Sequence, residues 1–193
     1  MNLEEFVRCH VSEDVYKHCV ATAEMAANLA KHHRLDSQKA RDAGLLHDVA
    51  RSLDDAGLLR EAERLGIEPS DVEKSNPVLL HPKVAARMAR DELGIEDREI
   101  LEAIEAHTTG ARGMGKVARV LFVADYAEPT RDMPGVESVR ALLPDHLDEA
   151  VLLVLKNKLD YVKRLGLTAD PHSVELWNEL VQKGIVVERG PRM

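Results

Sequence analysis

The sequence is poor in cysteine, in aromatic residues and in positive charge, and each shortage excludes a class of protein. Cys9 and Cys19 are its only cysteines, which excludes a disulfide framework or paired-cysteine zinc site and favours a reducing, cytoplasmic location. Lys and Arg number 26 against 34 Asp and Glu, a formal net charge of −8. A chain this acidic has no global attraction to phosphate backbones or anionic membranes, so we expect neither nucleic acid nor a membrane as partner.

Long apolar segments are missing as well. No run approaches the roughly 18 apolar residues of a membrane-spanning helix. The first ten residues contain Glu4, Glu5 and Arg8 and lack the apolar core of a signal peptide, so we expect no targeting segment.

What the sequence does contain is an ordinary globular composition and an excess of histidine. Apolar residues make up 45% and charged residues 31% of the 193 positions, which is typical of a folded domain rather than a disordered chain. Nine histidines outnumber the two Phe, three Tyr and one Trp together. Imidazole is the commonest metal ligand in proteins, so this excess indicates metal chemistry.

Helical periodicity runs through almost the whole chain. Val15, His18, Thr22, Met25 and Leu29 form an apolar stripe with the 3.6-residue period, on a helix that Ser12 or Asp14 opens. Cap residues and glycine stops predict further helices over residues 36–50, 54–65, 81–93, 96–107, 116–125, 145 or 148 to 165, and 171–183. Residues 69–77 are polar and predict a loop, whereas residues 185–187 form either a short strand or a frayed end. The sequence therefore predicts an all-α helical bundle, one domain over residues 1–193 with a core at about 10–181 and a short C-terminal tail.

Histidine and aspartate recur on the apolar faces of these helices. His18 lies on the first stripe, His47 and Asp48 are adjacent near the end of the second predicted helix, and His81 begins a helix. His107 and Asp125 end two further helices, Asp125 after five apolar residues. A buried carboxylate needs a cation or hydrogen bonds, and helical bundles build metal sites from inward-facing ligands on several helices.

Each of these residues also has an ordinary structural explanation. His18 and His107 fit core histidines, His81 fits a helix-entry residue, and Asp125 fits a helix-end hydrogen-bonding residue. A metal site is favoured because five separate segments, those with His18, His47-Asp48, His81, His107 and Asp125, each offer a ligand side chain on an inward face. We expect His10, His32, His33 and His146 to be solvated.

The order of His18, His47-Asp48 and a distant Asp125 resembles the HD-domain superfamily of metal-dependent phosphohydrolases, and His81 and His107 resemble its two-metal subset. The stretches 107–114 and 123–136, which read HTTGARGM and VADYAEPTRDMPGV, are similar to the YqeK-like bacterial HD proteins. Those proteins are symmetrical bis(5'-nucleosyl)-tetraphosphatases.

The resemblance implies an iron-dependent binuclear centre, with manganese or another divalent transition metal as alternatives. It implies that His18, His47, Asp48 and Asp125 hold one ion, and that Asp48 bridges to a second held by His81 and His107. It implies hydrolysis of diadenosine tetraphosphate to two ADP by a metal-activated water. The small-molecule partner is then a nucleotide, and a homodimer is left open.

The resemblance also indicates which residues contact the substrate. Arg131 is the leading phosphate ligand, because a guanidinium presents a planar fork of donors; a surface pair with Asp132 or Glu128 is its ordinary alternative. Thr108 contacts phosphate unless it belongs to a simple turn. Asp170, Pro171, His172 and Ser173 contact the nucleotide at a helix start, although capping explains Ser173 as well.

Two departures from the family pattern stand out. Arg51 replaces a lysine common in HD enzymes three residues after the metal aspartate, which puts a general-acid role there in doubt, and Trp177-Asn178 replaces Tyr-Asn. The alternatives are another HD phosphohydrolase acting on a mononucleotide or other phosphate ester, and a metal- or nucleotide-binding module without turnover.

Overall fold

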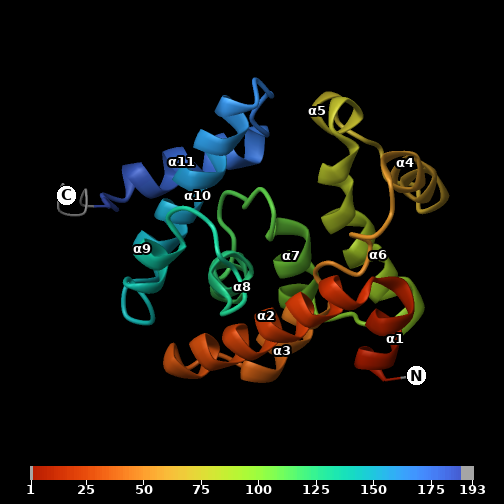
Figure 1. Ribbon diagram of the computed structural model, residues 1–193, viewed down its shortest axis with the longest axis horizontal. Helices are drawn as coiled ribbons and strands as arrows, with labels where there is room; N and C mark the ends of the chain where they lie inside the picture. The colour runs from red at the N-terminus through yellow and green to blue at the C-terminus, as the bar shows by residue number, and fades with distance from the viewer. Residues whose placement is uncertain (1, 188–193) are drawn as a thin grey trace.

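The computed structural model describes residues 2–187, and over that range it contains helices and turns but no strand (Figure 1). The elements are α1 (Leu3–His10), α2 (Glu13–His32), α3 (Ser37–Leu46), α4 (Asp55–Arg64), α5 (Asp71–Ser75), the 3₁₀ turn η1 (Pro77–Leu80), α6 (His81–Leu93), α7 (Arg98–Ala106), α8 (Lys116–Ala127), α9 (Val136–Arg140), α10 (Leu147–Arg164) and α11 (Pro171–Gln182). The predicted all-α fold is confirmed.

Helix α8 is the centre of the molecule. It packs against α2, α3, α7, α9 and α10, and Figure 1 shows it between α2 and α3 on one side and α10 on the other. Its residues 120–127 are all buried, which is the pattern of a helix apolar on all sides. Asp125 is therefore carried into the core by its helix.

A close contact between backbones joins α2 and α3. A Cβ atom on Gly44 would meet the Cα of Ala23 at 2.7 Å, so the two helices approach as closely as they do only because this residue has no side chain. That approach sets His18 of α2 opposite His47, which follows the last residue of α3.

Capping residues begin several helices, as predicted for Ser12 and Asp36, whereas the helix predicted from residue 96 begins only at Arg98, after its cap Asp97. The side chains of Ser12, Asp36, Asp54 and Asp97 accept hydrogen bonds from the first-turn amides of α2, α3, α4 and α7, satisfying donors that no helical carbonyl reaches. Gly94 ends α6 at φ +67° in the left-handed region, where glycine has no steric penalty.

Several short elements differ from the sequence predictions. The predicted loop at 69–77 contains α5 and the start of η1, because Ser70 and Glu73 form a capping box that nucleates a turn of helix. The helix predicted over 36–50 ends at Leu46 and continues as turns. α1 and α9 were not predicted, and residues 185–187 form no strand; residues 188–193 of the predicted tail lie outside the described residues.

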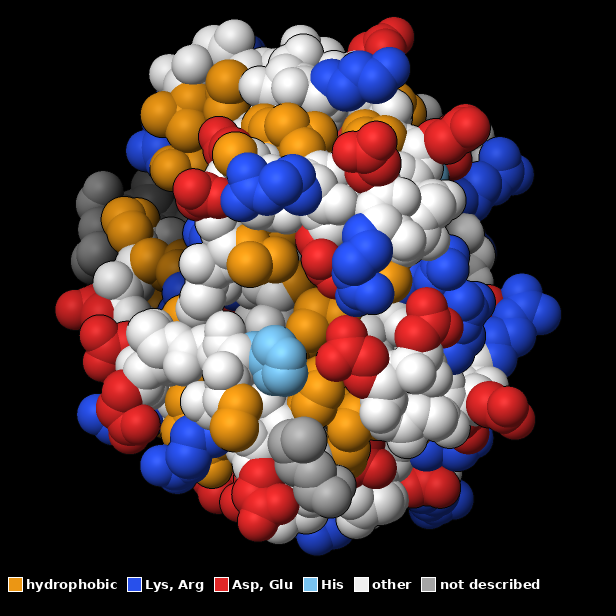
Figure 2. Space-filling model, turned by 90° about the vertical axis from the view of Figure 1, so that its right-hand side faces the viewer, with side chains coloured by type: hydrophobic (Ala, Val, Ile, Leu, Met, Phe, Trp, Pro, Cys, Tyr) orange, Lys and Arg blue, Asp and Glu red, His pale blue; other side chains and the backbone are white. Residues whose placement is uncertain are grey.

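The surface carries mixed charge. On the face in Figure 2, acidic and basic side chains are interspersed, with apolar side chains between them. Among the helices of residues 2–187, none is both long and apolar enough to cross a membrane.

Candidate metal centre

Three histidines lie immediately after a helical turn and bond back to it. The Nδ1 atoms of His47 and His107 each lie 2.7 Å from the carbonyl oxygen three residues earlier, on Gly44 and Ile104, and His81 bonds to Val78 in the same way. A carbonyl only accepts, so each Nδ1 carries the proton and each Nε2 presents a lone pair. This is how metal-ligating imidazoles are oriented.

His18 is oriented by a carboxylate instead. Its Nδ1 lies 3.1 Å from Oε1 of Glu128, a side chain that is completely buried. Glu128 in turn accepts hydrogen bonds from the backbone amide and hydroxyl of Thr130, both at 2.6 Å. The Nε2 of His18 is thus also the ring nitrogen that presents a lone pair.

The Nε2 atoms of His18 and His47 lie close to each other and to the Asp125 carboxylate. His18 Nε2 lies 3.2 Å from His47 Nε2 and 3.1 Å from Asp125 Oδ1, and His47 Nε2 lies 3.7 Å from the same oxygen. These three residues come from α2, the end of α3 and α8.

Asp48 stands between this group and a second one. Its Oδ2 lies 3.7 Å from His47 Nε2 and 3.9 Å from His18 Nε2. Its Oδ1 faces the other way, 3.1 Å from His81 Nε2 and 3.5 Å from His107 Nε2, and those two nitrogens are 3.1 Å apart. The two oxygens of one carboxylate therefore face two separate histidine pairs.

This arrangement fits metal ions. Nitrogen and oxygen ligands that sit about 2.0–2.2 Å from one ion lie roughly 3–3.5 Å apart, which is close to most of the separations above. The donor set is imidazole and carboxylate without thiolate, which suits iron, manganese and zinc. His18–His47–Asp125 and His47–Asp48–His107 each bring three ligand atoms within 4.8 Å of one another. Histidines that served only to fill the core would not direct four Nε2 atoms toward two carboxylates.

The electrostatics keep these groups ready to bind cations. Burial opposes ionisation of Asp48, but His47, His107 and His81 lower its pKa well below the usual value. Burial likewise opposes Asp125, whose pKa is lowered by His18, His47 and Lys158. Burial and the neighbouring imidazoles lower the pKa of His107 to about 4, so its Nε2 is unprotonated at neutral pH.

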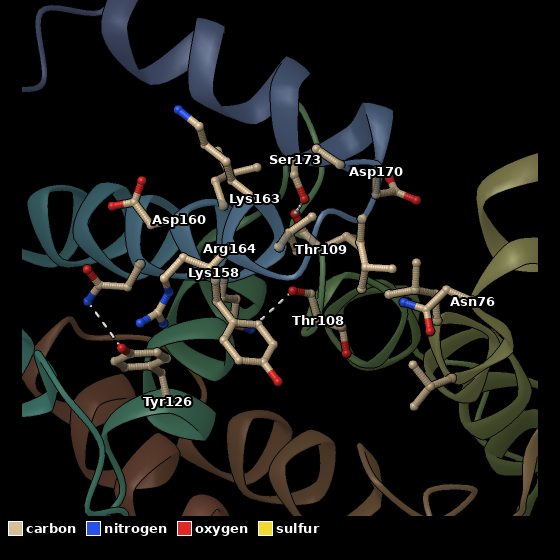
Figure 3. A pocket seen from close by; sticks show the side chains of 18 of the residues that line it. Asn76, Thr108, Thr109, Tyr126, Lys158, Asp160, Lys163, Arg164, Asp170 and Ser173 are labelled. Carbon is tan, nitrogen blue, oxygen red and sulfur yellow. Dashed lines mark hydrogen bonds between the residues drawn. The ribbon is translucent and has the colours of Figure 1, made fainter.

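A cavity of about 1130 Å³ opens beside this cluster (Figure 3). Of the predicted substrate contacts, Thr108, Asp125, Arg131, Asp170 and Ser173 line it. Pro171 and His172 are exposed and do not line it. Pro171 is the first residue of α11, and the His172 side chain bonds to Asp170. Asp170 also caps α11, and the Ser173 hydroxyl donates to the Thr109 carbonyl at 2.8 Å.

Arg131 contacts two candidate metal ligands and also pairs with the buried Glu128, whose Oε1 lies 3.8 Å from the Arg131 Nε. Its Nη2 lies 3.2 Å from Asp125 Oδ1 and 3.0 Å from His18 Nε2, while its side chain remains 36% exposed toward the cavity. Its position supports the phosphate-binding prediction. Arg51, by contrast, is exposed and lies outside the cavity lining.

Three residues that matter to this geometry were not singled out from the sequence. Glu128 orients His18, and Arg140 donates to the carbonyls of residues 127, 128 and 131, which fixes the turn that carries Glu128 and Arg131. Lys158 Nζ donates to the carbonyls of His107 and Thr108 at 3.0 and 3.1 Å and lies 3.7 Å from Asp125 Oδ2. No local sequence signal marks these roles of Glu128, Arg140 or Lys158.

The prediction for the remaining histidines is right for His10, His32 and His146, which are exposed, but wrong in part for His33. His33 is half-buried at the end of α2, and its Nε2 is buried without a hydrogen-bond partner among the described residues.

The comparison with protein families matches an HD domain model over residues 15–130. The chain belongs to the HD domain family. All six residues predicted as metal ligands fall inside the matched segment, whereas α9, α10 and α11 lie beyond it.

Known relatives of this HD domain cover nearly its whole length. A "Bis(5'-nucleosyl)-tetraphosphatase, symmetrical" of Halalkalibacterium halodurans is 34% identical over 92% of this chain and 94% of its own. The protein of the same name in Bacillus subtilis is 34% identical over 94% of this chain and 98% of its own. A solved structure from Clostridium acetobutylicum, described as a "predicted HD superfamily hydrolase involved in NAD metabolism", has a TM-score of 0.90 and 31% identity over 94% of this chain and 96% of its own.

Proposed function

We propose that this HD domain is a metal-dependent phosphohydrolase that cleaves diadenosine tetraphosphate symmetrically into two ADP. The observation that carries the proposal is the Asp48 carboxylate, whose two oxygens face two histidine pairs, in a cluster that reaches a large cavity through Asp125. Full-length relatives named for this reaction support the choice of substrate.

The proposal assigns the six ligands to two ions. His18, His47, Asp48 and Asp125 hold one, and Asp48, His81 and His107 hold the other, with iron as the expected metal and manganese as an alternative. When bound, two such ions supply positive charge for the phosphates and lower the pKa of a coordinated water toward 7. The chain acts as one domain, because the cavity takes walls from η1, the α7–α8 loop, α10 and α11.

The side chains around the cavity have roles of their own in this proposal. The Arg131 guanidinium binds phosphate oxygens as a fork of donors. Lys158 adds a second positive charge beside Asp125 while holding the carbonyls of His107 and Thr108. Thr108, Asp170 and Ser173 position one nucleoside diphosphate half, so that its β-phosphorus is presented to the cluster. Such positioning favours only the phosphorus that is held in line for attack.

The test is elemental analysis of the purified protein followed by chromatography of early products from diadenosine tetraphosphate. Nearly two transition-metal ions per chain and ADP as the sole nucleotide product are expected. An equimolar pair of ATP and AMP would refute symmetrical cleavage even in a fast hydrolase. Faster release of phosphate from AMP than of ADP from the dinucleotide would favour a mononucleotidase instead.

A further inference from the structure

The cavity is larger than one nucleotide half requires. At about 1130 Å³ it exceeds the roughly 300–1000 Å³ of pockets that enclose a single drug-sized ligand. Figure 3 shows it extending to both sides of Thr108, with Asn76 and Asp170 on one side and Lys158, Arg164 and Tyr126 on the other. The half assigned above to Asp170 and Ser173 occupies the first side, which leaves the α10 side for another ligand group.

Helix α10 places three evenly spaced side chains along that second side. Lys158, beside Asp125, is followed by Tyr161 and Arg164 at intervals of three residues, and all three line the cavity. At 1.5 Å rise per residue, this series spans about 9 Å along the helix axis, starting from Lys158. The series therefore begins with a cation beside Asp125 and continues along the helix with an aromatic ring and a second cation.

Tyr161 has the properties of a stacking platform. It is 55% exposed although it is aromatic, and the Arg164 guanidinium lies 5.8 Å from the centre of its ring. An exposed aromatic ring that lines a cavity offers stacking to a nucleobase, and a neighbouring guanidinium adds a cation–π contribution and a phosphate contact.

We propose that Tyr161 and Arg164 form the subsite for the second nucleoside of a dinucleoside polyphosphate. The inference rests on the proposed function. The adenine of the departing half stacks on Tyr161, Arg164 contacts its sugar or phosphate edge, and Lys158 and Arg131 flank the phosphate chain between the two halves. The subsite explains a preference for substrates with a nucleoside at both ends.

Kinetics of Tyr161→Ala with two substrates test this subsite. Diadenosine tetraphosphate carries the second nucleoside, and adenosine 5'-tetraphosphate lacks it. Loss of base stacking is expected to raise the KM for the dinucleotide about 5- to 150-fold and to leave the KM for the mononucleotide nearly unchanged. Tyr161→Phe keeps the ring and should restore the preference. Leu165→Ala, at the similarly exposed C-cap residue of this helix, outside the cavity lining, is the matched control.

Two outcomes overturn the subsite: Tyr161→Ala that changes both KM values equally, or neither. Calorimetric binding of a methylene-bridged, non-hydrolysable diadenosine tetraphosphate separates this failure from failure of the proposed function. A wild-type protein that binds the analogue no more tightly than adenosine 5'-tetraphosphate has no second subsite, even if it makes two ADP. A preference for the analogue that disappears in Tyr161→Ala supports the subsite, even if the products are ATP and AMP.

Discussion

The ligand cluster and the cavity walls are built in opposite ways. The cluster lies within residues 15–130, and its side chains are buried and hydrogen-bonded on the side away from the candidate metals. Much of the cavity wall comes from residues 131–173, where Arg131, Tyr161 and Arg164 keep substantial exposure. Metal ligands need fixed geometry, and substrate contacts need access. Under the proposed function, the first region therefore supplies the chemistry, and the second contributes most of the substrate contacts.

The largest effect should come from Asp48→Ala. Among the described residues, it removes the one carboxylate whose oxygens face both histidine pairs, so we expect loss of both metals and of activity. Elemental analysis of the purified variant measures this directly. Asp145→Ala, at an exposed carboxylate outside the cluster, is the control. Retention of one ion at full occupancy would show that Asp48 does not bridge.

The two halves of the cluster should respond unequally to histidine loss. His81→Gln is expected to remove one ion and keep the other, because His18 and His47 retain the Asp125 carboxylate while His81 and His107 share only one oxygen of Asp48. Metal content and chelator release rates measure the effect, with the exposed His146→Gln as control. If both ions leave together, the halves are a single cooperative site.

Arg131→Ala should separate the two regions most clearly. The metals are expected to stay bound, while kcat/KM falls about 10- to 150-fold. This fall corresponds to the loss of ~1.5–3 kcal/mol of transition-state binding, the range for a charge-assisted hydrogen bond. Metal analysis and steady-state kinetics on the same sample give both readouts. Metal loss equal to that of Asp48→Ala would make Arg131 part of the cluster, through its contacts with His18 and Asp125.

Glu128→Gln should have the smallest effect of the four. Gln keeps the shape but loses the charge that orients His18 Nδ1, and it places an amide group toward Thr130, which donates to both carboxylate oxygens. Loss of such an orienting partner typically weakens metal affinity about 10- to 100-fold. Competition with a metal indicator dye measures the change, and unchanged affinity would contradict a positioning role for Glu128.

The sequence predicted the helices well wherever local signals were strong. The predicted caps at Ser12 and Asp36 and the stop at Gly94 all hold, because capping involves residues only a few positions apart. The short helices α1, α5 and α9 were missed because a few residues give too little periodicity. The ligand types were also visible, since His and Asp on apolar faces are unusual.

The roles of Glu128, Lys158 and Tyr161 came only from the tertiary structure. Glu128 meets His18 across 110 positions of sequence, and Lys158 meets Thr108 across 50. Packing of α8 against α2 and α10 determines these contacts, and no local pattern encodes them.

The sequence by itself determined an all-helical chain with six candidate metal ligands of suitable chemistry, because periodicity and residue type are local properties. The tertiary structure decided which oxygen of Asp48 faces which histidine pair and which side chains of α10 line the cavity. Those distances depend on how helices from distant parts of the chain pack, and that packing is fixed by the whole core together.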